Sequence, residues 1–266
     1  MISDFHMHSK FSGDSEADPN EIISTAISRG MNCICFTDHL DLDYPEPDCD
    51  FDLDVDSYYD NINILQENYS DRLDIRIGIE TGLEPHLAKR LDERINRHDF
   101  DFIIGSSHIV NGMDPYYKSF FDTRTNKEAY TEYFTSILEC LETCHNFDVY
   151  GHLDYVIRYT PYKDQKFYYS DYSDMIDEIL KRLITSGKGI EINTGGYAAG
   201  LNALNPSPDI IRRYKELGGE IITVGSDAHT TDRIGADFDK AEAVLKECGF
   251  KYYTVFKNRK PQFIPL

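Results

Sequence analysis

Short apolar runs alternate along the chain with longer stretches in which apolar residues recur every three or four positions. The runs at 33–36 and 75–79 are short and largely apolar, which is typical of buried strands. Between Pro19 and Gly30 the apolar spacing follows the helical period, and Asp18 is placed as an N-cap. The same alternation predicts strands within 2–9, 33–36, 75–79, 100–105, 147–151, 189–193, 220–224 and 252–256, and helices at about 19–29, 57–70, 84–97, 127–145, 171–186, 208–217 and 238–248.

Seven strand–helix units in succession favour a parallel sheet, because parallel strands need a crossover helix between them. Polar, ligand-type residues follow nearly every strand, and six different strands contribute them. An open sheet would gather such residues mainly at one switch point, whereas a closed barrel collects them around its C-terminal rim. We therefore expect an α/β fold, a (β/α) barrel of seven units, in a single domain spanning residues 1–266.

Histidines and carboxylates dominate these strand ends. In the first strand, His6 and His8 are two residues apart, so they share one face about 7 Å apart along the chain. A lone histidine is more often a capping or core group than a ligand, but a set of eight or more at one topological position predicts a metal site. Nitrogen and oxygen ligands without thiolate suit Zn, Mn or Fe, and their number exceeds what one ion can hold. The strand-end set is His6, His8, His39, Glu80, His108, His152, Asp227 and His229, with Asp14 and Asp38 close by.

At these residues the chain resembles the PHP (polymerase and histidinol phosphatase) superfamily. The motifs that carry the resemblance are His6-x-His8, Thr37-Asp38-His39, Glu80, Ser107-His108, Gly151-His152-Leu153-Asp154 and Ser226-Asp227-Ala228-His229, in family order over essentially the whole chain. The resemblance implies a distorted seven-stranded, TIM-like barrel with three divalent metal ions at its C-terminal rim.

The family's ligand sets, carried over by position, divide these residues among three ions. One ion would be held by His6, His8, Glu80 and Asp227, the second by Glu80, His108 and His152, and the third by Asp14, His39 and His229. Asp14 is the least secure member, because some PHP proteins have a histidine at that position. Asp38 and Asp154 are expected to orient an imidazole N–H.

The nearest likeness within the superfamily is to the histidinol-phosphatases of histidine biosynthesis, which implies hydrolysis of L-histidinol phosphate, a small phosphorylated substrate. Clustered divalent ions would neutralise the phosphate and lower the pKa of a bound water toward about 7, so no Ser or Cys nucleophile is required. Asp227 or His229 could protonate the leaving oxygen. Another PHP phosphoesterase, such as a phosphodiesterase, a nucleotide phosphatase or a phosphotyrosine phosphatase, is the alternative, and a non-enzymatic metal-binding module is a further one.

Three residues outside the ligand set are candidates for binding substrate. Arg158 and Arg233 follow ligand-bearing strand ends, where a guanidinium can make paired bonds to phosphate oxygens. Pairing with one of the many surface acids is the alternative for both. Tyr117, in the aromatic stretch 116–121, is a candidate for contact with the imidazole of the substrate.

Charge and composition narrow the possible partners. The net charge of −20 disfavours nucleic acid and anionic membranes as partners, because no basic surface is available to replace counterions. Six cysteines without a disulfide-type spacing favour a reducing cytoplasm, and the oligomeric state stays open. Residues 41–56 hold eight acidic groups and no Lys or Arg, which favours an exposed loop over a lid above the site.

Overall fold

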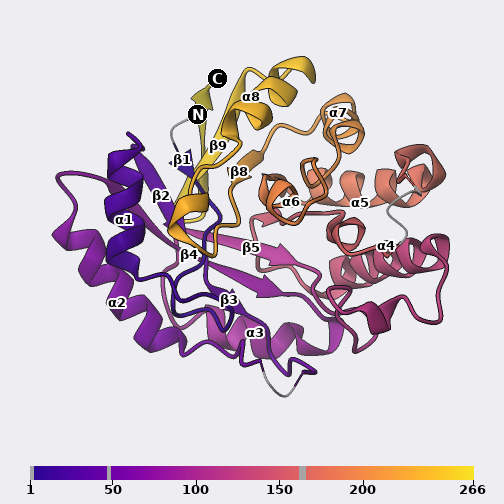
Figure 1. The fold of residues 1–266 in the computed structure, drawn as a ribbon, viewed down its shortest axis with the longest axis horizontal. Coiled ribbons are helices and arrows are strands. Elements are labelled where there is room, and N and C mark those ends of the chain that lie inside the picture. The colour runs from indigo at the N-terminus through magenta and orange to yellow at the C-terminus, as the bar shows by residue number, and fades with distance from the viewer. Residues whose placement is uncertain (1–2, 47–48, 162–165) are drawn as a thin grey trace.

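The computed structural model describes residues 3–46, 49–161 and 166–266. Seven of its strands form one parallel sheet in the order β1-β2-β4-β5-β6-β7-β8, and β3 pairs with the far half of β4. Figure 1 shows these strands surrounded by helices. The strands are β1 (Ser3–Asp4), β2 (Cys33–Phe36), β3 (His39–Leu40), β4 (Asp74–Gly82), β5 (Phe102–Ser106), β6 (Val149–Tyr150), β7 (Gly189–Asn193), β8 (Ile222–Gly225), β9 (Tyr252–Lys257) and β10 (Lys260–Pro265).

The first and last strands of the sheet approach each other, so the sheet is a nearly closed barrel. The Phe5 amide donates to the Val224 carbonyl (3.0 Å), and the His8 amide donates to the Ala228 carbonyl (2.9 Å). Gly225 permits this approach, since a Cβ there would lie 2.2 Å from the Cβ of His6. The expected seven-stranded barrel is confirmed.

The helices follow from the local signals that predicted them. Asp18 caps α1 through the Asn20 amide, and Thr125 and Glu128 form a capping box at α4. In the described part of the chain, no helix combines the length and the apolar character needed to cross a membrane. The helices are α1 (Pro19–Ser28), α2 (Val55–Asn68), α3 (Ala88–Ile95), α4 (Asn126–Thr143), α5 (Ser173–Thr185), α6 (Gly195–Ala198), α7 (Pro208–Glu216) and α8 (Phe238–Glu247), with 3₁₀ turns η1 (Pro85–Leu87), η2 (Lys118–Phe120), η3 (Tyr155–Arg158), η4 (Tyr169–Asp171) and η5 (Thr231–Arg233).

The chain ends in a hairpin rather than in the single predicted strand at 252–256. Strands β9 and β10 pair antiparallel around Asn258 and Arg259, which both have a positive φ. The Arg259 amide donates to the Asp101 carbonyl, and the ring of Phe256 lies 4.9 Å from that of Phe102. The hairpin therefore covers the N-terminal end of the barrel, opposite the strand ends that carry the ligand-type residues.

The expectation of an exposed loop at 41–56 is wrong for several of its residues. Asp41, Leu42 and Leu53 are buried, and the ring of Phe51 packs against the imidazole of His39. In this stretch acidic residues alternate with apolar ones, and the apolar side chains pack against the rim. Pro47 and Asp48 lie outside the described residues.

Candidate metal centre

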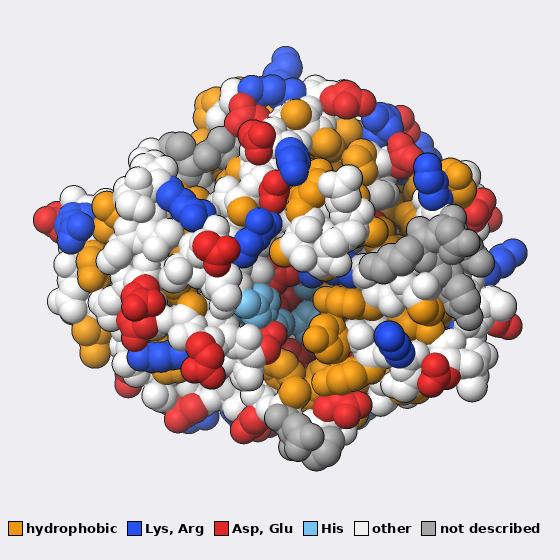
Figure 2. Space-filling view, in the orientation of Figure 1, with side chains coloured by type: hydrophobic (Ala, Val, Ile, Leu, Met, Phe, Trp, Pro, Cys, Tyr) orange, Lys and Arg blue, Asp and Glu red, His pale blue; other side chains and the backbone are white. Residues whose placement is uncertain are grey.

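The strand ends at the C-terminal rim meet around one cavity of about 380 Å³. Figure 2 shows histidines at the base of the hollow on this face. Of the nine residues predicted as metal ligands, His6, His8 and Glu80 are completely buried. The other six line the cavity: Asp14, His39, His108, His152, Asp227 and His229.

Glu80, near the end of β4, is the hub of the cluster. Its Oε2 atom lies 3.0 Å from His39 Nδ1 and 3.2 Å from His6 Nε2. Its Oε1 atom lies 2.9 Å from His152 Nε2 and 3.4 Å from His108 Nε2. One carboxylate thus faces imidazoles from four different strand ends, which is the arrangement that a bridging ligand requires.

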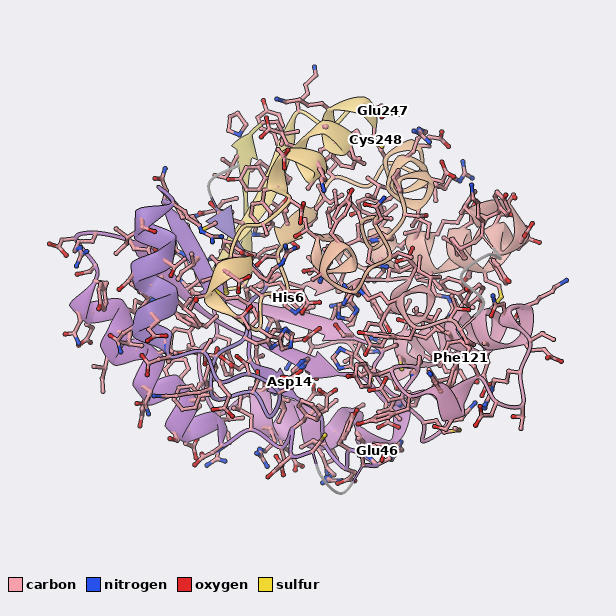
Figure 3. The ribbon with its side chains drawn as sticks, viewed as in Figure 1. His6, Asp14, Glu46, Phe121, Glu247 and Cys248 are labelled. Atoms are coloured by element: carbon pink, nitrogen blue, oxygen red, sulfur yellow. The ribbon has the colours of Figure 1, made fainter. Side chains whose placement is uncertain are left out.

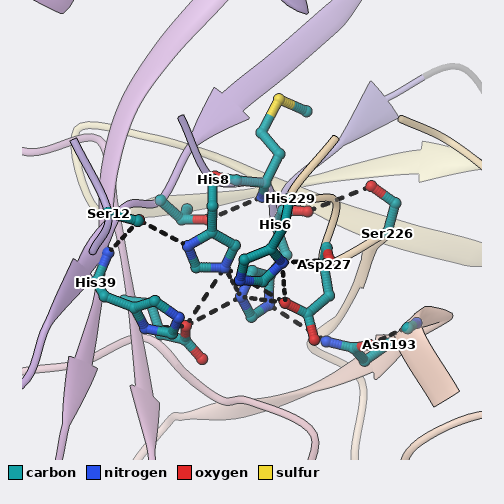
Figure 4. Close-up of polar contacts among 12 residues, drawn as sticks. His6, His8, Ser12, His39, Asn193, Ser226, Asp227 and His229 are labelled. Carbon is teal, nitrogen blue, oxygen red and sulfur yellow. Dashed lines mark hydrogen bonds and ion pairs between the residues drawn. The ribbon is translucent and has the colours of Figure 1, made fainter. Parts of the chain in front are cut away.

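The tautomers of His6 and His8 follow from their outer hydrogen bonds, of which Figure 4 shows the one between His8 and Ser12. His6 Nδ1 lies 2.6 Å from Glu191 Oε1, a pure acceptor, so Nδ1 carries the proton. Ser12 donates its hydroxyl proton to Asp38 and accepts from His8 Nδ1 at 3.0 Å. His8 Nε2 is therefore left as a lone pair. His6 Nε2 is one too whenever that ring is neutral, as metal binding requires, and the two atoms lie 3.1 Å apart.

Two lone pairs so close repel each other unless a cation lies between them. With metal–nitrogen bonds of about 2.1 Å, tetrahedral ligands lie about 3.4 Å apart, so the observed separation suits a shared ion. Burial, together with the neighbouring imidazoles of His229 and His39, lowers the pKa of His8 to about 3, which keeps its ring neutral. A neutral imidazole is the form that binds metal.

Buried atoms without a hydrogen bond point to the same conclusion. Within the described residues these include Glu80 Oε2, His39 Nδ1 and His152 Nδ1. Groups of three whose ligand atoms all lie within 4.8 Å of one another include His6, His8 and Glu80, and also Glu80, His108 and His152. The residues present fit divalent metal ions.

The third predicted set lies at the more exposed side of the cavity. Asp14 Oδ2 is 2.9 Å from His229 Nε2 and 3.7 Å from His39 Nε2. The His8 ring stacks on both imidazoles, with ring centres 4.2 Å apart in each case. The geometry thus gathers Asp14 with His39 and His229, and it adds His8 as a neighbour of that set.

Two carboxylates that the sequence reasoning missed hold ligand histidines. Glu191 accepts from His6 Nδ1 and, through Oε2, from the His152 amide at 2.9 Å. Asp41 Oδ1 lies 2.8 Å from His108 Nδ1. A charged residue inside the apolar strand 189–193 was a usable signal for Glu191, since a buried charge needs a partner.

The contacts of Asp38 and Asp154 differ from the expectation that each orients an imidazole directly. Asp38 accepts from the amide and hydroxyl groups of Ser9 and Ser12, so it reaches His8 only through Ser12. Asp154 accepts from the Asn205 side chain and the Ser207 amide. Each carboxylate braces a loop at the rim.

The Asp227 carboxylate, at the edge of the cluster, accepts a hydrogen bond from the Arg158 guanidinium. Asp227 is the second residue after β8 and has φ at +54°, a conformation that turns its carboxylate toward His8 Nε2, 3.3 Å away. Arg158 Nη1 donates to Asp227 Oδ2 at 2.8 Å. Burial alone would raise the pKa of Asp227, but the charges of His6 and Arg158 and the bond with His8 lower it well below its usual value.

The predicted substrate-binding residues occupy different surroundings. Tyr117 lines the cavity. Arg158 is buried and also donates to Asn193 and Asn205, while Arg233 pairs with Asp237. Figure 3 shows His6 and Asp14 toward the centre of the ribbon, with Phe121, part of the predicted aromatic stretch, well to one side. Phe121 is buried in the hydrophobic core.

Comparison with known proteins reveals relatives over nearly the whole chain. The family model for the PHP domain matches residues 4–195. A histidinol-phosphatase from Lactococcus lactis subsp. lactis is 34% identical over 258 residues, which cover 97% of this chain and 95% of that protein. A probable histidinol-phosphatase from Clostridium acetobutylicum is 35% identical over 252 residues, which cover 94% and 95%.

Among solved structures, the crystal structure of the Lactococcus lactis histidinol phosphate phosphatase matches with a TM-score of 0.91. The two chains are 34% identical, and the match covers 98% of each. That crystal structure contains zinc, L-histidinol and phosphate.

Proposed function

The chain belongs to the PHP domain family, and on that premise we propose that it is a histidinol-phosphatase, which hydrolyses L-histidinol phosphate to L-histidinol and phosphate. The observation that carries the proposal is the near full-length likeness, in sequence and in fold, to a protein crystallised with both products of that reaction. A small phosphorylated substrate suits the cavity, whose volume of about 380 Å³ is typical of small-molecule sites.

Three divalent ions, zinc, manganese or iron, serve the reaction in this proposal. When bound, they neutralise phosphate oxygens and lower the pKa of a water molecule, so the chain needs no Ser or Cys nucleophile. The pairing of His6 with His8 supports the first ligand set, and the contacts of Glu80 with His108 and His152 support the second. The contacts of Asp14 support the third.

His229 is the better placed of the two candidates to donate a proton to the leaving alkoxide, a role open to it only while its Nε2 is not a ligand of the third ion. Its side chain lines the cavity and is 30% exposed, so a bound ester can reach it. The Asp227 carboxylate instead accepts from Arg158 and faces His8, which commits it to the role of an anionic ligand.

Arg158, Arg233 and Tyr117 remain candidates for substrate contact. The bond of Arg158 to Asp227 gives that arginine a further role, because it holds the carboxylate in place beside the cluster. Tyr117 lies on the cavity wall, where the imidazole of histidinol could stack against it.

The experiment that tests the function is phosphate release from L-histidinol phosphate beside a panel of other monoesters and diesters, with and without a chelator. We expect kcat/KM for L-histidinol phosphate to exceed the panel by at least about tenfold and to vanish on chelation. Preference for a nucleotide, a phosphotyrosine or a diester would contradict the proposal.

A further inference from the structure

Asp114 is a buried carboxylate that faces the cavity away from the metal cluster. Its Oδ2 accepts from the Tyr44 hydroxyl at 2.6 Å, and its Oδ1 accepts from the Tyr116 amide at 2.7 Å. Among the described residues, no Lys, Arg or His lies within ion-pair distance of it. Burial raises the pKa of Asp114, although these two hydrogen bonds oppose the shift, so its negative charge is only partly compensated.

The loop after β5 brings the Asp114 carboxylate back toward the ligand His108. Val110 and Met113 exchange backbone hydrogen bonds at 2.9 and 3.1 Å around Asn111 and Gly112, which both have a positive φ. An Asn-Gly pair is the preferred sequence for such a tight reversal. The chain therefore turns back at once after His108, and the residue that follows the turn is Asp114.

Tyrosines surround Asp114 and connect it to the cluster. Tyr44, Tyr116, Tyr155 and Tyr159 line the same cavity. The Tyr155 hydroxyl lies 3.5 Å from Asp114 Oδ1, and its ring centre lies 5.0 Å from that of His152. A carboxylate flanked by aromatic faces, one ring away from the phosphate-binding side, is a suitable environment for an organic cation.

We propose that Asp114 determines specificity by binding the ammonium group of the substrate, with the neighbouring tyrosines shielding the pair from water. The inference rests on the proposed function, since L-histidinol phosphate carries its ammonium on the carbon next to the phosphorylated CH₂ group. The amine is charged at neutral pH, whereas an imidazole with a pKa of about 6.5 is mostly neutral. Phosphate esters without a cation would leave Asp114 buried and unpaired, so the same residue disfavours them.

The alternative role for Asp114 is structural, as the anchor that ties Tyr44 to the loop after β5. Two variants separate these roles. Asp114→Asn keeps an oxygen that accepts from the Tyr116 amide but removes the charge. Tyr44→Phe is the matched control, because it removes the anchoring hydrogen bond and leaves the carboxylate.

The test compares two substrates: L-histidinol phosphate and its analogue without the amino group, 3-(imidazol-4-yl)propyl phosphate. For Asp114→Asn we expect kcat/KM to fall about 10- to 100-fold on L-histidinol phosphate, mainly through KM, the scale of one hydrogen-bonded charge pair. On the analogue it should stay within about threefold of the parent protein. Tyr44→Phe, which keeps the carboxylate, should retain the preference for L-histidinol phosphate over the analogue that Asp114→Asn loses.

Equal losses on both substrates, or no loss, would overturn the role of Asp114 while the proposed function stands. If the parent protein fails to hydrolyse L-histidinol phosphate, the function and this inference fall together. A measurement on the parent protein alone covers the case in which a variant does not fold. L-histidinol should inhibit at least about tenfold more strongly than 3-(imidazol-4-yl)propanol, and equal inhibition would overturn the inference.

Discussion

Replacing Arg158 by methionine tests whether this arginine holds the site together. Its guanidinium is buried and donates to Asp227 Oδ2 (2.8 Å), Asn193 Oδ1 (2.7 Å) and Asn205 Oδ1 (2.7 Å). Methionine fills a similar length of space but leaves one buried carboxylate and two amide oxygens without this donor. Breaking a buried ion pair on one side costs about 3–5 kcal/mol.

For a chain of this size each kcal/mol corresponds to about 2–4 °C, so Arg158→Met should lower Tm by about 6–20 °C. Arg158→Lys should recover only part, because one ammonium cannot serve three acceptors in the plane of a guanidinium. Arg233→Met is the matched control: its guanidinium pairs with Asp237 at a partly exposed position, where such pairs contribute about 0–1 kcal/mol. A Tm for Arg158→Met within 2 °C of the parent would refute this reasoning.

Kinetics on the same variants distinguish the two roles proposed for Arg158. If it acts by holding Asp227, Arg158→Met should lose metal, measured by elemental analysis, and kcat should fall with metal content. If it contacts phosphate, the metal content should stay unchanged while kcat/KM falls by a factor that corresponds to about 2–4 kcal/mol of lost transition-state stabilisation. Kinetics within twofold of the parent at unchanged metal content would exclude Arg158 from the site.

Three further predictions concern metal and charge. Exhaustive chelation should abolish activity, and Zn, Mn, Fe or Co should restore it; full turnover with less than about a tenth of an ion per chain would contradict the metal mechanism. Glu80→Ala should lower metal content by more than one equivalent, because Glu80 faces five imidazoles, whereas Asp14→Ala should lower it by one at most, and the reverse order would refute Glu80 as the bridge. Burial lowers the pKa of Lys188 from 10.5 to about 8, so between these values the folded chain binds fewer protons than the unfolded one. The free energy of unfolding of the parent should therefore rise relative to that of Lys188→Met as pH increases from about 8 to 10.5, and a flat or falling difference would show that Lys188 keeps its ordinary pKa.

Local sequence determined much of the barrel because each strand–helix unit is recognisable within some 30 residues. The apolar run at 75–79 and the capped helix after Asp18 are set by neighbours a few positions away, and the structure contains both. Parallel strands place their C-terminal ends at one rim, so residues such as His108 and His152 could be grouped from their positions alone.

Contacts between distant segments were decided only by the tertiary structure. Glu191 reaches His6 across 185 positions, because β8 lies between β7 and β1 in the closing barrel. No local pattern states which side chain will face another after closure. Asp38 likewise belongs to a recognisable motif. The loop packed beside it, however, places the hydroxyl groups of Ser9 and Ser12 against its carboxylate, so no imidazole among the described residues contacts it directly.

Arg158 shows both what the sequence determined and what only the tertiary structure decided. Its position after a ligand-bearing strand end identified it as part of the site, since loops at one rim converge. The direction of its side chain depended on η3, which points the guanidinium at Asn193, Asn205 and Asp227. Sequence order thus determined which residues meet at the rim, whereas the orientation of each side chain depended on the strands and loops packed around it.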